Sequence, residues 1–208
     1  NRDPKSSFLT EIASTIGVLE HAIKNVDKWT KDEKRPSNVD RPFFIRMLMG
    51  LLGSKSYIKY QPLGTVGVIS PWNFPVNLIL APLGGIFAAG NRAMIKPSEL
   101  TPATSEVTKK MFEAYFDKSE AAVFTGDAEV GAAFSALPFD HLLFTGGTQI
   151  GKKVMKAASD NLVPVTLELG GKSPVIVDED ANLSEVAKKV MRGKTMNAGQ
   201  ICLAPDYL

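Results

Sequence analysis

The chain has 208 residues, of which 44% are hydrophobic and 22% are charged, enough apolar material for one domain or two small ones. The formal net charge of +2, from 24 basic and 22 acidic residues, gives no electrostatic reason to expect a nucleic acid or a membrane as partner. A single cysteine excludes a disulfide within the chain and is typical of a reducing compartment, so we expect a cytoplasmic protein.

Residues 1–60 predict a long helix followed by a linker. Apolar residues recur at three- and four-residue steps from Phe8 to Trp29, which is typical of a helix whose apolar face packs on a core. Residues 31–42 are polar and contain two prolines, which predicts a loop. Residues 43–53 are apolar, and the sequence leaves open whether they form a short helix or an oligomer contact.

From residue 61 onwards, short β-rich runs alternate with helical stretches. Strands are expected at 65–69, 92–95, 121–124, 141–144, 163–167 and 175–177, and helices at 77–89, 101–116, 128–136, 148–158 and 183–193. The alternation predicts an α/β fold with a Rossmann-like, mostly parallel sheet covered by helices on both faces. We assign 61–171 to this domain and expect 172–208 to begin a second α/β domain. Ligands of such sheets bind beyond the carboxyl ends of the strands.

Two of the predicted strands end in segments suited to a dinucleotide. The sequence FTGGTQIG (144–151) follows a strand and opens a helix, where glycines admit a phosphate and the helix N-terminus offers free N–H groups. It is not G-x-G-x-x-G, and alone it is also typical of an ordinary turn. Lys96 and Glu99 can hydrogen-bond ribose hydroxyls, or the segment is only a proline turn capped by Ser98.

Three further segments carry groups that suit catalysis. The amide of Asn73, between two prolines, suits an oxyanion, unless it only caps the next helix. Glu168 lies between two leucines, and an apolar environment makes a carboxylate a stronger proton acceptor, which suits a general base; the alternative is an edge-strand glutamate that faces water. Cys202, the only thiol, is either a nucleophile or a small buried hydrophobe. His21 and His141 lack companions for a metal site, and none is expected.

In this order the motifs closely resemble the aldehyde dehydrogenase superfamily. The matching stretches are PWNFP (71–75), GNRAMIKPSE (90–99), FTGGTQIG (144–151), LELGGKSP (167–174) and NAGQICLAPDY (197–207). Within the superfamily, YQPLGTVGVISPWNFP, AEVGAAFSALPFDHLLFTG and CLAPDY look most like coniferyl aldehyde dehydrogenases. One departure is Gly147, where the family usually has serine.

The resemblance implies a cofactor, a substrate and a role for each matching residue. NAD or NADP is the cofactor, and an aldehyde, aromatic and similar to coniferyl aldehyde, is the small-molecule substrate. Cys202 attacks the aldehyde to form a thiohemiacetal, Asn73 and the Cys202 N–H hold the oxyanion, and Glu168 activates the water that hydrolyses the thioester. The resemblance assigns cofactor binding to Trp72, Lys96, Ser98, Glu99, Gly146, Gly147, Thr148, Gln149, Ile150 and Gly151.

Two alternatives stay open beside this reading. One is a CoA-acylating relative, against which Glu168 argues because that chemistry needs no carboxylate base. The other is a non-catalytic NAD(P)-binding protein on the same scaffold, against which Asn73, Glu168 and Cys202 together argue. A homodimer or tetramer is expected at full length. Both ends of the sequence look cut, and the family's nicotinamide-ribose glutamate would lie beyond Leu208, so we expect the 208-residue piece alone to be a poor enzyme.

Overall fold

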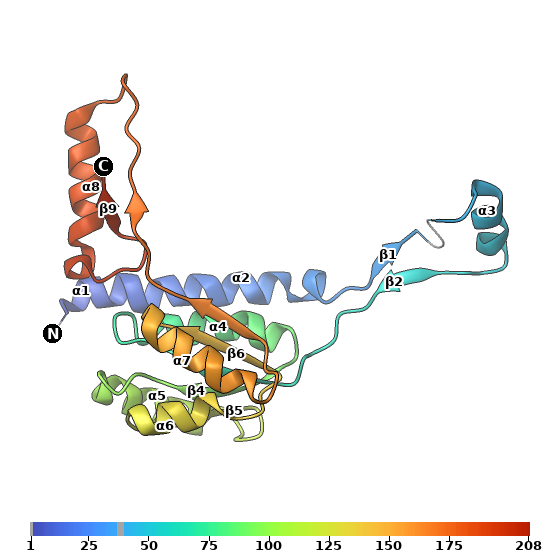
Figure 1. Cartoon of the computed structure of the whole chain (residues 1–208), viewed down its shortest axis with the longest axis horizontal. Helices are drawn as coiled ribbons and strands as arrows, with labels where there is room; N and C mark the ends of the chain where they lie inside the picture. Colours follow the sequence, from blue (N-terminus) through green and yellow to red (C-terminus); the bar gives the residue numbers. More distant parts are fainter. Residues whose placement is uncertain (1, 37–39) are drawn as a thin grey trace.

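A parallel sheet of five strands forms the body of the molecule, in the computed structural model that describes residues 2–36 and 40–208 (Figure 1). The strand order is β5–β4–β3–β6–β7, and every neighbouring pair is parallel. The strands are β3 (Thr65–Ile69), β4 (Arg92–Lys96), β5 (Ala121–Val123), β6 (His141–Thr145) and β7 (Val165–Glu168). The expected Rossmann-like α/β fold is confirmed.

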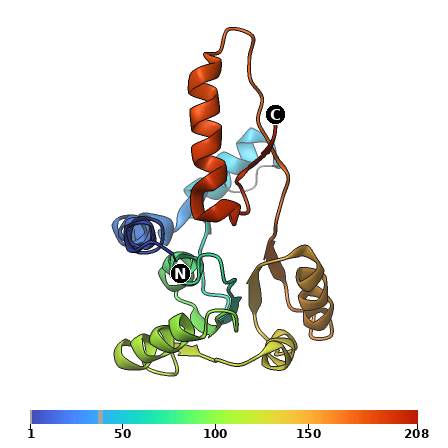
Figure 2. The ribbon, with the colours of Figure 1, turned by 90° about the vertical axis from the view of Figure 1, so that its left-hand side faces the viewer.

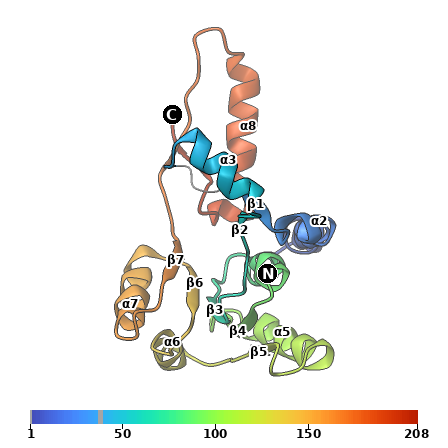
Figure 3. The same ribbon diagram turned by 90° about the vertical axis from the view of Figure 1, so that its right-hand side faces the viewer.

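Helices cover both faces of this sheet (Figure 3). They are α4 (Asn77–Ala88) and α5 (Pro102–Tyr115) on one face and α6 (Ala128–Ser135) and α7 (Thr148–Ser159) on the other. Local chemistry fixes where two of them begin. Pro102 occupies the first turn of α5, where a missing N–H costs nothing, and the Asp127 carboxylate caps α6 by accepting the N–H groups of Glu129 and Val130.

Each face of the sheet has its own apolar core. The strand residues Val68 and Ile95 are 1% and 0% exposed and pack beneath α4 and α5. On the other face, Leu142 and Phe144 pack beneath α6 and α7. Strands buried on both faces are typical of parallel sheets, which explains why they read as short apolar runs in the sequence.

The sheet has a topological switch point beside its central strand. The chain passes from β3 outwards to β4 and β5, and then crosses back to place β6 on the other side of β3. Ile69 of β3 pairs with Lys96 on one side and with Phe144 on the other, so the carboxyl ends of these strands are level. Ligands of open α/β sheets bind at such a point.

The N-terminal helix forms as expected but buries a different face. It runs through α1 (Pro4–Ser7), the π-helical segment η1 (Phe8–Ala13) and α2 (Ser14–Trp29), and α2 packs on α4. Glu11, Thr15 and Ala22 are buried, whereas Phe8, Ile12, Ile16, Ile23 and Trp29 are exposed. The prediction that the apolar face packs on a core is therefore wrong for these five exposed residues, although Leu19 of the same repeat lies against α4. The reason is a close helix crossing: a Cβ on Gly84 would lie 3.1 Å from Leu19 and 3.4 Å from Ala22, which only small residues permit.

An arm projects from the far end of α2 (Figure 1). It consists of β1 (Glu33–Arg35), α3 (Phe43–Leu51) and β2 (Ser56–Ile58), with β1 and β2 antiparallel. The prediction of a loop over 31–42 is therefore wrong for β1, while residues 37–39 lie outside the described residues. The helical alternative for 43–53 is confirmed, and the side chains of Phe43, Phe44 and Leu51 are exposed.

The chain after β7 forms a second extension (Figure 2). It contains β8 (Ser173–Pro174), α8 (Leu183–Thr195), the 3-10 turn η2 (Met196–Gly199) and β9 (Pro205–Tyr207), and β8 pairs with β9. The strand predicted at 175–177 is wrong, because pairing is limited to 173–174 plus one bond from the Val175 N–H to the Tyr207 carbonyl at 2.8 Å. Among the described residues, no helix has the length and apolarity needed to traverse a bilayer.

Candidate active site

Four of the predicted site residues lie at or just after the carboxyl ends of four strands, at one edge of the sheet. Asn73 follows β3, Glu99 follows β4, Gly146 follows β6, and Glu168 is the last residue of β7. Because all the strands are parallel, their carboxyl ends share an edge. The fold therefore brings together segments that are up to 95 residues apart, from Asn73 to Glu168.

The glycine-rich turn after β6 opens directly into α7. Gly147 is the N-cap residue and no side chain caps the helix, so the N–H groups of Thr148 and Gln149 are available to a ligand, whereas the Ile150 N–H donates to the Gly147 carbonyl at 3.1 Å. Thr148, Gln149 and Ile150 are exposed at this helix start. Gly151 lets the end of the Leu169 side chain pack closely, since a Cβ there would lie 2.8 Å from the Leu169 Cδ2 atom. At Gly147 a Cβ would meet nothing within 4 Å, so this position has room for the serine that the family usually has there.

Lys96 and Glu99 form an ion pair at the end of β4. The Lys96 ammonium is buried and donates to the Pro97 carbonyl at 2.9 Å and to the Glu99 carboxylate at 3.3 Å. A hydrogen bond from its own backbone N–H, and then the Lys96 contact, lower the pKa of Glu99, against the opposing effect of partial burial. Ser98 is buried and its hydroxyl accepts the Leu100 N–H, so it shapes the turn. The turn-cap interpretation fits Ser98, whereas Lys96 is not a solvated charge.

A cavity of about 300 Å³ lies beside Glu99. Its walls come from the β4–α5 loop, from the first turns of α5, and from Thr125 and Gly126, which follow β5. A Cβ on Gly126, whose φ is +151°, would lie 2.5 Å from Val130, so this wall requires a glycine. Sequence reasoning missed Thr125 and Gly126, although a polar residue and a glycine directly after a strand is the same signal that drew attention to residues 144–151.

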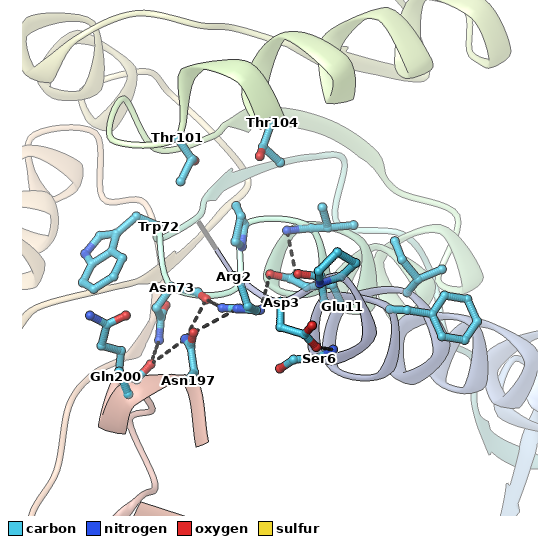
Figure 4. Close-up of a pocket in the computed structure, with 17 residues that line it drawn as sticks. Arg2, Asp3, Ser6, Glu11, Trp72, Asn73, Thr101, Thr104, Asn197 and Gln200 are labelled. Carbon is cyan, nitrogen blue, oxygen red and sulfur yellow. Dashed lines mark hydrogen bonds and ion pairs between the residues drawn. The ribbon is translucent and has the colours of Figure 1, made fainter. Parts of the chain in front are cut away.

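The Asn73 turn meets the turn before Cys202 (Figure 4). The Asn73 side-chain amide donates to the Gln200 carbonyl at 2.9 Å, and the Asn73 carbonyl accepts the Asn197 side-chain amide at 3.1 Å. Trp72, Asn73, Asn197 and Gln200 together line part of a cavity of about 1010 Å³. Neither Asn197 nor Gln200 was singled out from the sequence, although both lie in the stretch NAGQIC.

Cys202 is exposed and follows a strained turn. Asn197 and Ala198 have φ of 50° and 55°, and Gly199 has φ of 78°. Asparagine and glycine tolerate this left-handed region, whereas alanine there costs on the order of 1–3 kcal/mol. A Cβ built on Gly171 would lie 3.9 Å from the Cys202 carbonyl oxygen, so the thiol-bearing turn lies next to the glycine pair that follows Glu168. The alternative of a buried, purely structural cysteine does not match this position.

Glu168 occupies the edge strand β7, and its side chain is exposed. The apolar surroundings expected from its flanking leucines are therefore absent in the described chain. Successive side chains of a strand point to opposite faces, so Leu167 packs into the core while Glu168 points away from it. The Glu168 carbonyl accepts the Gly146 N–H at 3.0 Å, which ties the two strand ends together.

Glu11 and Arg2 complete the site and were not found from the sequence. The buried Glu11 carboxylate accepts the N–H groups of Val76 at 3.0 Å and Asn77 at 2.8 Å, so it caps α4 from another helix. It also pairs with the Arg2 guanidinium at 3.1 Å. The signal available in the sequence was an acidic residue inside an otherwise apolar repeat.

Fold and site together match one enzyme family. A family model described as "Aldehyde dehydrogenase family" matches residues 1–208, and the chain belongs to that family. The "Coniferyl aldehyde dehydrogenase" of Pseudomonas sp. (strain HR199 / DSM 7063) is 53% identical over 208 residues, and the "Probable coniferyl aldehyde dehydrogenase" of Caulobacter vibrioides is 58% identical over the same length. In both cases 100% of this chain is covered, and it spans 41% of the relative's length.

Two solved structures of aldehyde dehydrogenases have a similar fold. The substrate-bound state of Staphylococcus aureus AldH matches with a TM-score of 0.87 and 46% identity, over 98% of this chain and 42% of that one. An aldehyde dehydrogenase of Mycobacterium tuberculosis complexed with NAD+ matches with a TM-score of 0.83 and 29% identity, over 98% of this chain and 40% of that one.

Proposed function

We propose that this chain is the cofactor-binding part of an NAD(P)-dependent aldehyde dehydrogenase and carries its nucleophile, Cys202. The observation that carries the proposal is the contact between the Asn73 turn and the turn before Cys202, at the sheet edge that also holds Gly146 and Glu99. An amide donor, a thiol and an uncapped helix N-terminus at one edge suit covalent chemistry next to a dinucleotide.

The described residues fit a dinucleotide in two places. The uncapped start of α7 suits the pyrophosphate, because the Thr148 and Gln149 N–H groups are available and nothing lies within 4 Å of a Cβ at Gly147. The cavity beside Glu99 suits the adenosine ribose, with Lys96 holding the carboxylate in place. We place Trp72, next to Asn73, towards the nicotinamide end. When bound, the nicotinamide accepts the hydride that leaves the substrate.

In the proposed reaction the covalent steps take place on Cys202. Its thiolate forms an S–C bond to the aldehyde carbon, and the carbonyl electron pair moves to oxygen. The second N–H of the Asn73 amide and the Cys202 N–H donate to that oxyanion. Loss of hydride leaves a thioester on Cys202. Glu168 takes a proton from water, which attacks the thioester and releases the carboxylic acid and the thiolate. The exposed position of Glu168 gives it access to that water.

The substrate and the cofactor preference follow from the relatives and from Glu99. Because two relatives at 53% and 58% identity carry the name coniferyl aldehyde dehydrogenase, we propose an aromatic aldehyde as substrate. The lowered pKa of Glu99 keeps this carboxylate ionised at neutral pH, and a negative charge beside the ribose disfavours a 2′-phosphate. NAD is therefore the better fit, with NADP as the second cofactor to test.

A substrate panel on the full-length protein tests the proposal. Production of NADH or NADPH is followed by absorbance with coniferyl aldehyde, cinnamaldehyde and an aliphatic aldehyde of similar size, with and without CoA. We expect NAD-dependent oxidation that is fastest with the aromatic aldehydes and independent of CoA. An absolute requirement for CoA would favour the acylating alternative. NAD binding without turnover of any aldehyde would favour the non-catalytic one.

We also propose that the full-length protein is a cytoplasmic homodimer or tetramer. The exposed apolar helix α3, carried on an arm away from the sheet, supports a subunit contact (Figure 1). We also propose that the chain divides into three parts, residues 1–60, 61–171 and 172–208. The end of β7 at Glu168 supports the boundary at residue 171.

A further inference from the structure

One arginine joins three segments that are distant in the sequence (Figure 4). Arg2 donates through Nε to the Asn197 side-chain oxygen at 2.9 Å, through Nη1 to the Glu11 carboxylate at 3.1 Å, and through Nη2 to the Asn73 carbonyl. Its guanidinium carbon also lies 4.7 Å from the centre of the Phe74 ring. Asn73 and Asn197 belong to the two turns that meet at the proposed site, so Arg2 bridges both turns.

We propose that Arg2 is a positioning residue for aldehyde oxidation, which fixes the Asn73 turn relative to the turn that leads into Cys202. The proposal rests on the proposed function. The two oxyanion donors, the Asn73 amide and the Cys202 N–H, come from segments 129 residues apart, from 73 to 202. Donors of an oxyanion must keep their spacing within about 0.5 Å, and that spacing depends on how the two turns are joined.

The turn before Cys202 requires such a support. Asn197 and Ala198 are held in the left-handed region, which persists only when surrounding contacts enforce it. The Asn197 side chain is held at both ends, because its oxygen accepts from Arg2 and its amide donates to the Asn73 carbonyl. Arg2 therefore acts on Cys202 through Asn197, without contact with the thiol itself.

Glu11 fixes Arg2 in turn. Its carboxylate is buried, is held by the Val76 and Asn77 N–H groups, and faces Arg2 with its other oxygen. α4 begins directly after the Asn73 turn, so the helix, the acid and the arginine form one unit. Only arginine has the planar fork that serves all three directions, whereas a lysine ammonium is a single compact donor group.

The test compares Arg2→Lys with Arg92→Lys in the full-length protein. Arg92 is exposed at the amino end of β4, away from the site, and makes no side-chain hydrogen bond within the described residues. We expect Arg2→Lys to lower kcat and the pre-steady-state burst rate by roughly ten- to a hundredfold, with KM for NAD changed less than about twofold. Arg92→Lys leaves all three unchanged. Combining Arg2→Lys with Asn197→Ala is expected to cost little more than the larger single change, because both remove the same link.

Glu11→Gln keeps an acceptor for the α4 N–H groups but loses the charge that holds Arg2, and it is expected to show the same selective loss of kcat. The inference is overturned if kcat of Arg2→Lys and Glu11→Gln is unchanged. It is equally overturned if the loss of kcat comes with a matching loss of NAD binding and a lowered Tm, which marks a merely structural role. An additive double variant also contradicts it. An inactive Cys202→Ala beside a fully active Arg2→Lys would leave the proposed function standing and reject only this inference.

Discussion

The sheet body and the extension that carries Cys202 are held together in different ways. In the body, residues 65–169, buried side chains fill both faces of the sheet. In residues 170–208, all of which the structure describes, Ala204 is the one buried residue. The β8–β9 pair joins two segments within the extension. The extension contacts the body instead through polar contacts such as the Asn73–Gln200 hydrogen bond. The proposed dinucleotide site thus rests on a core, and the proposed nucleophile rests on hydrogen bonds.

The ion pairs of the extension illustrate the difference. Asp206 is exposed and pairs with Lys172 at 3.2 Å and with Lys194 at 3.3 Å. Hydrogen bonds from Lys172 and then Lys194 lower the pKa of Asp206. Solvent screens such exposed pairs, so they orient the segment but contribute little to stability. By contrast, the body is stabilised by burial of apolar surface. Cofactor binding and chemistry should therefore respond to different substitutions.

Cys202→Ala gives the largest expected effect and separates the two regions. In the full-length protein, removal of the thiol should lower aldehyde-dependent NADH formation by roughly 10⁴-fold or more, because no thiohemiacetal can form. The dissociation constant for NAD, measured by fluorescence titration or calorimetry, should change less than about twofold, because the proposed dinucleotide site lies on the body. Turnover near the wild-type rate would reject Cys202 as the nucleophile.

Glu168→Gln should give the next largest effect, on one half of the reaction. Loss of the base slows thioester hydrolysis by on the order of 10²- to 10⁴-fold, whereas formation of the thioester needs no external base once the thiolate has added. A burst of NADH with an amplitude close to the enzyme concentration, followed by slow steady-state turnover, is the expected stopped-flow signature. A lost burst would mean that Glu168 acts earlier, on the thiol itself.

Stability should distinguish the same regions by several kcal/mol. Ile95→Ala leaves a cavity under α4 and α5, since Ile95 is 0% exposed, and should lower the free energy of unfolding by about 2–5 kcal/mol. Ile176→Ala, in the extension and 93% exposed, is the matched control and should change it by less than about 0.5 kcal/mol. Urea denaturation of both variants measures the difference. Equal losses would show that the extension has a core of its own.

Features set by local rules were predictable from the sequence, and the sheet is the main example. Strands buried on both faces, such as β3 and β6, appear as short apolar runs between glycine- or proline-containing turns. Parallel pairing places the carboxyl ends of these strands at one edge, so the sequence alone predicts that the segments at Asn73, Glu99, Gly146 and Glu168 lie close together. The proposed roles of these residues stay predictions.

Features set by partners distant in sequence were not predictable. Periodicity identified an apolar face from Phe8 to Trp29 but carried no information on what covers it. Contacts with the start of α4 bury Glu11 and Thr15 instead. β1, β2, β8 and β9 are each at most three residues long, and only their pairing makes them strands. Arg2 joins Asn197 across 195 residues, a contact for which the local sequence has no signal.

The smallest expected effect comes from Gly147, at the point where the body would receive the cofactor. Its backbone, at φ −74° and ψ 144°, suits serine, and a Cβ there meets nothing within 4 Å. In Gly147→Ser, the hydroxyl can accept an N–H of the first turn of α7, which has no side-chain cap. We expect the free energy of unfolding to rise by a few tenths of a kcal/mol, roughly 0.3.

Gly146→Ser is the matched control for that change, one residue earlier in the same turn. A Cβ at Gly146 would lie 2.5 Å from the buried ring of Phe144, and this overpacking should cost about 1–3 kcal/mol. The two serines thus act in opposite directions, and thermal melts resolve their difference even though the first effect is small. Since the added hydroxyl at 147 can also donate to a phosphate, NAD affinity should stay within about twofold of wild type or improve. A Gly147→Ser variant that loses NAD binding tenfold or more would show that the pyrophosphate lies elsewhere than on this turn.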